Sequence, residues 1–298
     1  MKIAVTGSES FIGRVLVHLL LEQEAEVVGI DSAIPSFPGG SEVDIRDPDL
    51  PDLLPEGADA IIHLAAISRE PDCAGNPRLA FDINVTGTAN VIAAARRRNI
   101  RQVVFASSEW VYGDVANDTA QTEDTVIDIG RVLNEYAASK LAGEMALSVA
   151  IRRGLPGGTV LRFGIVYGPR PANWSAVEAL LNGVRTKDEV TVGSLATARR
   201  FIHVRDIASG IAAAIGRTGF EIFNIAGSEL ITLERVIGIA RAVTRRPISV
   251  IESNAAAVSI RNPISTKANQ MLGWRPAVSI EQGIAELAGY FGGSQEIA

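Results

Sequence analysis

Strand-like and helix-like segments alternate through the first half of this 298-residue chain. The run "AIIHLAA" is apolar along its length, as a strand buried on both faces should be. Such alternation requires crossover connections, which place helices on both faces of a parallel sheet. The sequence therefore predicts an α/β fold with a doubly wound parallel sheet of the Rossmann type. Its expected strands are 2–6, 26–30, 59–63, 102–106 and 157–162, and its expected helices are 12–23, 77–98 and 132–153.

The pattern changes after about residue 165, where "VYGPRPAN" is rich in turn residues. We expect residues 1–164 to form the sheet domain, with part of 196–226 returning to it. Residues 165–298 would mainly form a smaller C-terminal lobe that binds the substrate. The elements predicted there are a helix near 174–184, a strand at 189–192, a helix ending near 216, and helices near 232–245 and 280–291.

The composition narrows the classes of function and location. Cys73 is the only cysteine, so the chain can form no internal disulfide, which is typical of a reducing compartment. The histidines are far apart, and no metal site is expected. A net charge of -6 with both signs spread along the chain argues against a nucleic-acid partner. Met1 and Lys2 lead straight into a strand, and charges interrupt the apolar runs, so we expect a cytoplasmic protein without a membrane partner.

The opening "MKIAVTGSESFIGRV" has the layout of a dinucleotide-binding loop: a strand, a glycine turn and the start of a helix. Gly7 suits the tight turn and Gly13 suits close helix–strand packing, but Ser10 stands where a middle glycine is usual. The unpaired N–H groups at the helix start can bind a pyrophosphate. Asp31 ends the next strand, where a carboxylate binds ribose hydroxyls and repels a 2′-phosphate. These features predict NAD rather than NADP as the cofactor.

Two further patterns carry chemistry. In "EYAASK", Tyr136 and Lys140 are one helical turn apart and share a face. A nearby ammonium favours the phenolate, which makes a tyrosine usable in acid–base catalysis. In "VVFASSEWVYG", Ser107 and Ser108 end a strand, where open α/β sheets bind ligands. A serine hydroxyl there could bind the oxygen whose proton Tyr136 transfers, or it could only cap the turn.

Taken together, the chain resembles the extended short-chain dehydrogenase/reductase family, and within it the NAD-dependent sugar epimerases and dehydratases. The shared motifs follow one another in order along nearly the whole chain. They are TGxxGFIG at Thr6–Gly13 except for Ser10, an Asp-hydrophobic pair at Asp44 and Ile45, HLAA at His63–Ala66, NVxGT at Asn84–Thr88, SSxxVYG at Ser107–Gly113, YxxxK at Tyr136–Lys140, VYGPR at Val166–Arg170, RxFIHVxD at Arg199–Asp206 and LGWRP at Leu272–Pro276.

The resemblance implies roles for individual residues. Tyr136 would be the acid–base group, Lys140 would bind the nicotinamide ribose, and Ser108 would bind the reacting oxygen; Glu109 is a fourth catalytic candidate. The implied substrate-binding residues are Ser68, Ser108, Glu109, Trp110 and Arg199, of which Arg199 matches an arginine that holds a substrate phosphate. The implied cofactor-binding residues are Gly7, Ser10, Phe11, Ile12, Gly13, Asp31, Asp44, Ile45, Leu64, Ala65, Ala66, Asn84, Ser107, Tyr136 and Lys140.

The activity implied is NAD-dependent epimerisation of a sugar, foremost a nucleotide sugar, by transient hydride transfer in a homodimer. Alternatives are a nucleotide-sugar dehydratase, an NAD-dependent sugar dehydrogenase or reductase, and a non-catalytic NAD-binding regulator. Ile165 stands where nucleotide-sugar enzymes carry an asparagine, so sugars without a nucleotide also stay open. The family's 4,6-dehydratases have two acidic residues after the catalytic Ser or Thr, whereas this chain has Glu109 and then Trp110. Glu109 could therefore be a proton donor or could only bind a sugar hydroxyl.

Overall fold

Seven parallel strands form the central sheet of the computed structural model, which describes residues 1–115 and 118–293. Their order across the sheet is β11-β6-β5-β4-β1-β2-β3. The chain therefore runs outward from β1 in one direction and from β4 in the other, and ligands bind at such a switch point, beyond the carboxyl ends of the strands. The strands are β1 (Lys2–Thr6), β2 (Glu26–Asp31), β3 (Gly40–Glu42), β4 (Ala60–His63), β5 (Gln102–Ser108), β6 (Gly157–Phe163) and β11 (Gly219–Ile225).

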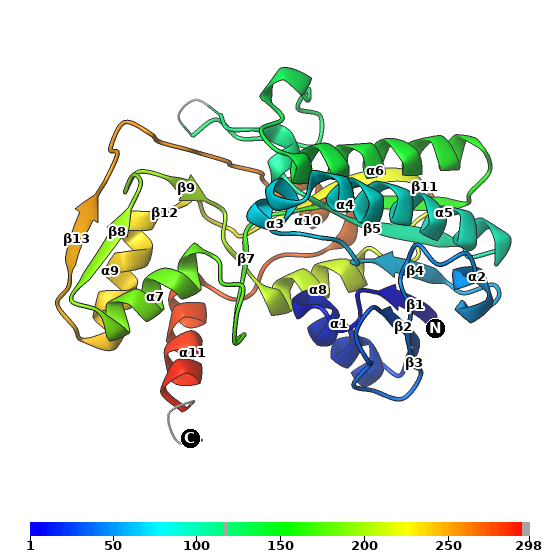
Figure 1. Cartoon of the computed structure of the whole chain (residues 1–298), viewed down its shortest axis with the longest axis horizontal. Helices are drawn as coiled ribbons and strands as arrows, with labels where there is room; N and C mark the ends of the chain where they lie inside the picture. Colours follow the sequence, from blue (N-terminus) through cyan, green and yellow to red (C-terminus); the bar gives the residue numbers. More distant parts are fainter. Residues whose placement is uncertain (116–117, 294–298) are drawn as a thin grey trace.

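Helices cover both faces of this sheet (Figure 1). One face carries α4, α5 and α6, and the other carries α1 and α8. Every residue of β4, β5 and β6 is buried, as expected for strands packed on both sides. Each face has its own apolar core, with Leu16 and Ile211 on the α1 side and Val91 and Leu147 on the α6 side. The predicted doubly wound parallel sheet is thus confirmed.

The helices of this half differ in detail from the predicted ranges. They are α1 (Phe11–Glu22), α2 (Leu50–Leu53), α3 (Glu70–Gly75), α4 (Pro77–Phe81), α5 (Thr88–Arg97) and α6 (Glu135–Arg152). The helix expected at 77–98 is interrupted by a π-helical turn, η1 (Asp82–Gly87), and α6 begins three residues later than expected. The later start has a clear cause, because the Asn134 side chain accepts a hydrogen bond from Ala137 N and caps the helix.

The second half of the chain adds a smaller group of elements at the left of Figure 1, around a core that includes Leu181, Val236 and Leu287. Two of its elements, β11 and α8, join the sheet domain: β11 pairs with β6, and α8 packs against α1. The remaining bounds are β7 (Val166–Tyr167), α7 (Ala176–Thr186), β8 (Glu189–Val192), β9 (Ala198–Arg199), β10 (Ile202–His203), α8 (Val204–Ala213), β12 (Ile231–Thr232), α9 (Leu233–Thr244), β13 (Ser249–Glu252), α10 (Thr266–Leu272) and α11 (Ile280–Gly293).

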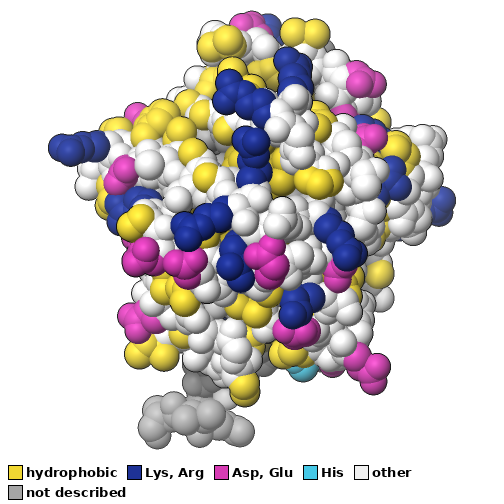
Figure 2. All heavy atoms as spheres, turned by 90° about the vertical axis from the view of Figure 1, so that its right-hand side faces the viewer, with side chains coloured by type: hydrophobic (Ala, Val, Ile, Leu, Met, Phe, Trp, Pro, Cys, Tyr) yellow, Lys and Arg dark blue, Asp and Glu magenta, His cyan; other side chains and the backbone are white. Residues whose placement is uncertain are grey.

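The end of the molecule farthest from this smaller group carries charges of both signs (Figure 2). Several arginines there are paired, for example Arg97 with Asp52 and Arg101 with Asp59. Across the described residues, no helix is both long enough and apolar enough to span a membrane.

Candidate active site

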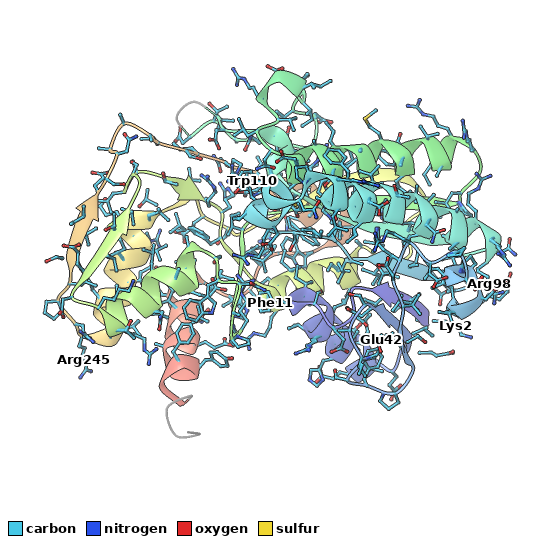
Figure 3. The ribbon with its side chains drawn as sticks, viewed as in Figure 1. Lys2, Phe11, Glu42, Arg98, Trp110 and Arg245 are labelled. Carbon is cyan, nitrogen blue, oxygen red and sulfur yellow. The ribbon has the colours of Figure 1, made fainter. Side chains whose placement is uncertain are left out.

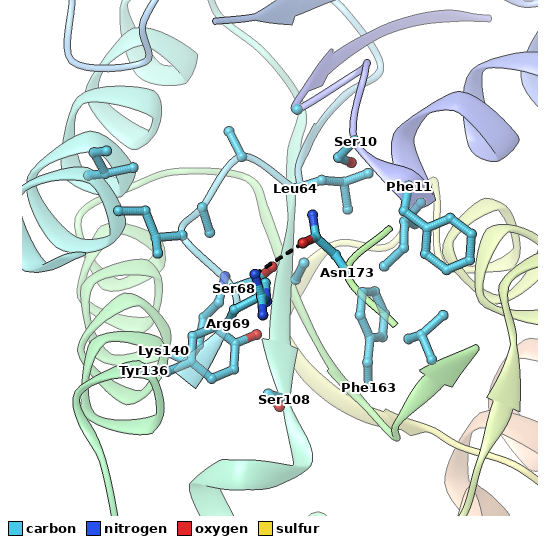
Figure 4. A pocket seen from close by; sticks show the side chains of 18 of the residues that line it. Ser10, Phe11, Leu64, Ser68, Arg69, Ser108, Tyr136, Lys140, Phe163 and Asn173 are labelled. Carbon is cyan, nitrogen blue, oxygen red and sulfur yellow. Dashed lines mark hydrogen bonds between the residues drawn. The ribbon is translucent and has the colours of Figure 1, made fainter. Parts of the chain in front are cut away.

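A cavity of about 740 Å³ runs along the carboxyl edge of the sheet. Its walls come from the ends of β1, β2, β4 and β5, from α6, and from the segment 163–175 of the second half (Figure 4). This edge includes the switch point between β1 and β4, where a ligand is expected. One end of the cavity is at the glycine loop and the other is at Tyr136.

The glycine loop is shaped by two close backbone contacts. Gly7 has φ +73°, and a Cβ there would lie 2.6 Å from Ala65 N. A Cβ on Gly13 would lie 2.1 Å from Gly7 O. Neither position can carry a side chain without moving backbone, so both glycines are required by the turn itself.

Ser10 has a function that its place in the glycine motif does not reveal. It is the N-cap of α1, with φ -65° and ψ 166°, and its Oγ accepts a hydrogen bond of 3.0 Å from Gly13 N. Ser10 O accepts from Arg14 N. The amides of Phe11 and Ile12 lie in the same first turn, at the positive end of the helix dipole, and are free of this cap. A serine therefore fits the loop while leaving a place for a pyrophosphate.

The adenosine end of the cavity is lined by Asp31, Asp44 and Ile45. The Asp31 carboxylate accepts hydrogen bonds from Glu9 N at 2.8 Å and Ala33 N at 3.0 Å, so its position is fixed by backbone. A hydrogen bond with Arg46 lowers the pKa of Asp44.

Leu64, Ala65 and Ala66 follow β4 and line the cavity between its two ends, as does Ser68. Two of the expected cofactor residues, Gly13 and Asn84, are not on the cavity wall. Asn84 lies behind it, where its amide bonds both Ile67 N and Ile67 O at 2.8 and 2.9 Å. It thus holds the loop that follows β4, and the π-helical turn that contains Asn84 brings it there.

Tyr136, Lys140 and Ser108 meet at the other end of the cavity (Figure 4). Burial raises the pKa of Tyr136 to about 12, against which a hydrogen bond with Ser108 acts. Burial also lowers the pKa of Lys140 to about 8. The Lys140 Nζ lies 5.7 Å from the centre of the Tyr136 ring. In this state, desolvation outweighs the expected stabilisation of the phenolate by the ammonium.

Ser107 is anchored from behind by a buried ion pair. Its hydroxyl donates to Glu144 Oε1 at 2.5 Å, and Glu144 also binds Arg162 through two hydrogen bonds, of 3.0 and 2.7 Å. Glu144 follows Lys140 by one turn on α6, so this ion pair fixes the helix that carries the candidate catalytic pair against β5 and β6.

Glu109 and Arg199 are off the cavity, whereas Trp110 lines it. The Glu109 side chain is fully buried, with Oε1 2.9 Å from Arg261 Nε and 3.5 Å from Arg199 Nε. Burial raises the pKa of Glu109, and the two guanidiniums oppose that change. Arg261 was not foreseen, because its segment carries no recognisable motif and only the folded chain brings it to Glu109.

The residues present suit a dinucleotide cofactor. The glycine cradle, the free amides at the start of α1 and the fixed carboxylate of Asp31 lie along one continuous cavity that ends at Tyr136 and Lys140. Within residues 1–115 and 118–293, no cluster of three or more His, Cys, Asp or Glu side chains could hold a metal ion.

Comparison with known proteins gives the same picture. The family described as "NAD dependent epimerase/dehydratase family" matches residues 3–226. A UDP-glucose 4-epimerase of Mycolicibacterium smegmatis is 31% identical, with 98% of each chain covered. A protein of Bacillus subtilis named "Uncharacterized UDP-glucose epimerase YtcB" is 30% identical over 97% of this chain and 98% of its own.

Solved structures share the whole fold. A UDP-glucose 4-epimerase of Thermus thermophilus, in complex with NAD, superposes with a TM-score of 0.82 at 26% identity, covering 99% of this chain and 100% of that one. A dTDP-glucose 4,6-dehydratase of Streptomyces venezuelae, with NAD bound, gives a TM-score of 0.86 at 25% identity, covering 99% and 98%. From the family match, these relatives and the cavity, we conclude that the chain belongs to the NAD-dependent epimerase/dehydratase family.

Proposed function

We propose that this protein is an NAD-dependent epimerase that inverts a carbon of a sugar by transient oxidation. The observation that carries this proposal is the meeting of Tyr136, Lys140 and Ser108 at one end of a cavity whose other end is a dinucleotide loop. The names of the relatives in Bacillus and Mycolicibacterium support a nucleotide sugar as the substrate.

The proposed roles follow from the positions of the side chains. Ser108 binds the sugar hydroxyl that reacts, and Tyr136 takes its proton as the carbinol is oxidised. NAD, when bound, accepts the hydride and later returns it to the other face of the sugar. Lys140 binds the nicotinamide ribose and, as a cation beside the phenol, counters the burial that raises the pKa of Tyr136. Trp110 closes the cavity beyond Ser108.

A dehydratase would need a carboxylic acid at the sugar. Glu109, the candidate for that task, is turned away from the cavity and bound by Arg261 and Arg199. This arrangement favours epimerisation over elimination, since the buried carboxylate is engaged elsewhere.

The test compares wild-type protein with Tyr136→Phe, using UDP-glucose and UDP-galactose as the first substrates. We expect the variant to lose roughly 10²-fold or more in turnover, because its ring can no longer transfer a proton. NAD binding should stay nearly unchanged. Tyr167→Phe is the matched control, because Tyr167 is a buried tyrosine outside the cavity.

The mass of the product separates the alternatives. Epimerisation leaves the substrate mass unchanged, whereas dehydration removes one water and a dehydrogenase accumulates NADH. A product lighter by one water would replace the epimerase proposal by the dehydratase. If Tyr136→Phe retained most of the wild-type rate, Tyr136 could not be the acid–base group.

A further inference from the structure

The cavity ends in a tryptophan with a charged support behind it. Trp110 lies in the short 3₁₀ turn η2 (Glu109–Tyr112), directly after Ser108, and its backbone N–H donates to Ser108 Oγ at 3.3 Å. Its side chain lines the same cavity as Tyr136. Figure 3 shows Trp110 and Phe11 in the region between the sheet domain and the smaller group of elements.

The guanidinium of Arg261 covers the Trp110 ring, with its carbon 3.8 Å from the ring centre. Arg261 is only 2% exposed and does not line the cavity. One side of the indole is therefore occupied by a cation inside the protein, in a favourable cation–π arrangement. The rest of the indole surface is what the cavity meets.

Arg261 is itself held by two carboxylates. Its Nε donates to Glu109 Oε1 at 2.9 Å, and its Nη1 donates to Asp114 Oδ1 at 3.1 Å. Ser259 Oγ lies 2.9 Å from both oxygens of Asp114, and Arg199 Nη2 donates to that hydroxyl at 2.6 Å. The ion pairs fix the plane of the guanidinium, and the guanidinium fixes the indole stacked on it.

From this arrangement we propose that Trp110 is the platform on which the sugar ring of the substrate stacks, and that Glu109 is a positioning residue that holds Arg261 behind it. A pyranose presents a face of C–H groups, and these pack well on the electron-rich face of an aromatic ring. The platform begins two residues after Ser108, so a ring stacked on it presents its hydroxyls to Ser108 and Tyr136.

This inference rests on the proposed function but concerns binding of the sugar rather than chemistry. It gives Glu109 a task that its full burial and two arginine partners explain, and that a proton donor to the sugar would not. It also explains why an aromatic side chain can replace the second acidic residue of the dehydratases at position 110, since stacking requires no proton transfer.

The test measures what the sugar adds to binding. Calorimetry on NAD-loaded protein, in a Tyr136→Phe background to prevent turnover, gives dissociation constants for UDP-glucose and for UDP, and their ratio is the sugar contribution. We expect wild-type Trp110 to favour UDP-glucose over UDP, and Trp110→Leu to reduce this ratio on the order of tenfold. Trp110→Phe should restore most of it, because a smaller aromatic face remains.

The matched control is Trp274→Leu. Trp274 is buried against α8, where its Nε1 donates to Ser209 Oγ, and it does not line the cavity. It should leave the ratio unchanged. Glu109→Gln keeps the size of the side chain but removes its charge from Arg261; it should lower the ratio less than Trp110→Leu does and leave the pH profile of turnover, measured with Tyr136 intact, unchanged.

Three results would overturn the proposal. One is a protein with Trp110 intact that does not distinguish UDP-glucose from UDP. Another is Trp110→Leu with an unchanged ratio, or with NAD affinity reduced as much as the ratio, which would place the cofactor on the indole. A third is Glu109→Gln that abolishes turnover at saturating substrate while the ratio stays the same. If Glu109→Gln fails to fold in thermal melts, the Trp110 variants decide. Failure of hydride transfer with Tyr136 intact would instead refute the proposed function and leave the binding ratio interpretable.

Discussion

At the scale of single residues, a few side chains with fixed charge or fixed position set what the cavity can bind. Asp31 is the clearest case, because two backbone amides, of Glu9 and Ala33, hold its carboxylate at the cavity wall. A carboxylate fixed in this way cannot easily move aside for another anion.

We therefore expect the protein to bind NAD much more tightly than NADP, since the 2′-phosphate would meet the carboxylate of Asp31. Asp31→Ala should narrow the difference between the two cofactors by roughly tenfold, because the repulsion is lost. Calorimetric titration measures both affinities. Asp59→Ala, outside the cavity, is the control, and equal or tighter binding of NADP by the wild type would contradict this prediction.

What the sequence could predict at this scale depends on whether a residue belongs to a local pattern. Tyr136, Lys140 and Ser108 lie in short motifs on one helix and one strand end, and the structure places all of them on the cavity. Arg261 and Asp114 reach Glu109 and each other only through contacts between distant segments. Glu109 itself was recognised, but the direction of its side chain depends on Arg261 and could not be derived from its neighbours in sequence.

At the scale of elements, α1 shows how one residue can serve both stability and ligand binding. Ser10 ends the glycine turn and caps the helix, so the replacement of the usual glycine costs the loop little. Other elements were harder to foresee. The strand β11 is read poorly from "GFEIFNI" because it lies at the sheet edge and is half exposed, and the π-helical turn before α5 depends on the contact of Asn84 with Ile67.

The cap on α1 leads to a stability prediction. Ser10→Ala should lower the free energy of unfolding by about 1 kcal/mol, whereas Ser10→Gly should lower it by only a few tenths, because glycine also tolerates the N-cap position. Chemical denaturation with NAD absent measures this difference. Ser8→Ala is the control, because the Ser8 hydroxyl is buried without a hydrogen-bond partner and its removal should be neutral or stabilising. Equal losses for Ser10→Ala and Ser8→Ala would contradict a capping role.

At the scale of the whole molecule, buried ionisable groups link stability to pH. Burial lowers the pKa of His63 to about 3, and its ring nitrogens lie 2.7 Å from Thr6 Oγ1 and 2.9 Å from Thr88 Oγ1. The folded protein therefore keeps His63 neutral at pH values where the unfolded chain binds a proton.

Between about pH 6.5 and 3, the unfolded state binds more protons at His63, so the free energy of unfolding should fall as the pH decreases through this window. Denaturation curves at several pH values measure the slope. His63→Asn should flatten it, whatever its effect on stability at neutral pH, whereas His18→Asn, at an exposed position, should leave it unchanged. An unchanged slope in His63→Asn would show that other groups dominate acid unfolding.

The assembly of the molecule can be predicted from the apolar residues left uncovered on α4 and α6. These helices are neighbours on one face of the sheet, and four large apolar side chains on them are exposed: Leu79 and Phe81 on α4, and Met145 and Val149 on α6, with Met145 exposed by 63%. Such a contiguous patch on neighbouring helices is typical of a subunit interface.

We therefore expect a homodimer with two-fold symmetry, in which α4 and α6 of each subunit pack against those of the other. Met145→Glu would place a charge in the centre of this interface and should yield monomers, as measured by light scattering at micromolar concentration. Met271→Glu is the matched control, because Met271 is an exposed methionine on α10, away from these helices. Because α6 also carries Tyr136 and Lys140, a dimer through this helix would hold both candidate sites in place. A wild-type protein that is monomeric at this concentration, or a Met145→Glu variant that remains dimeric, would contradict the prediction.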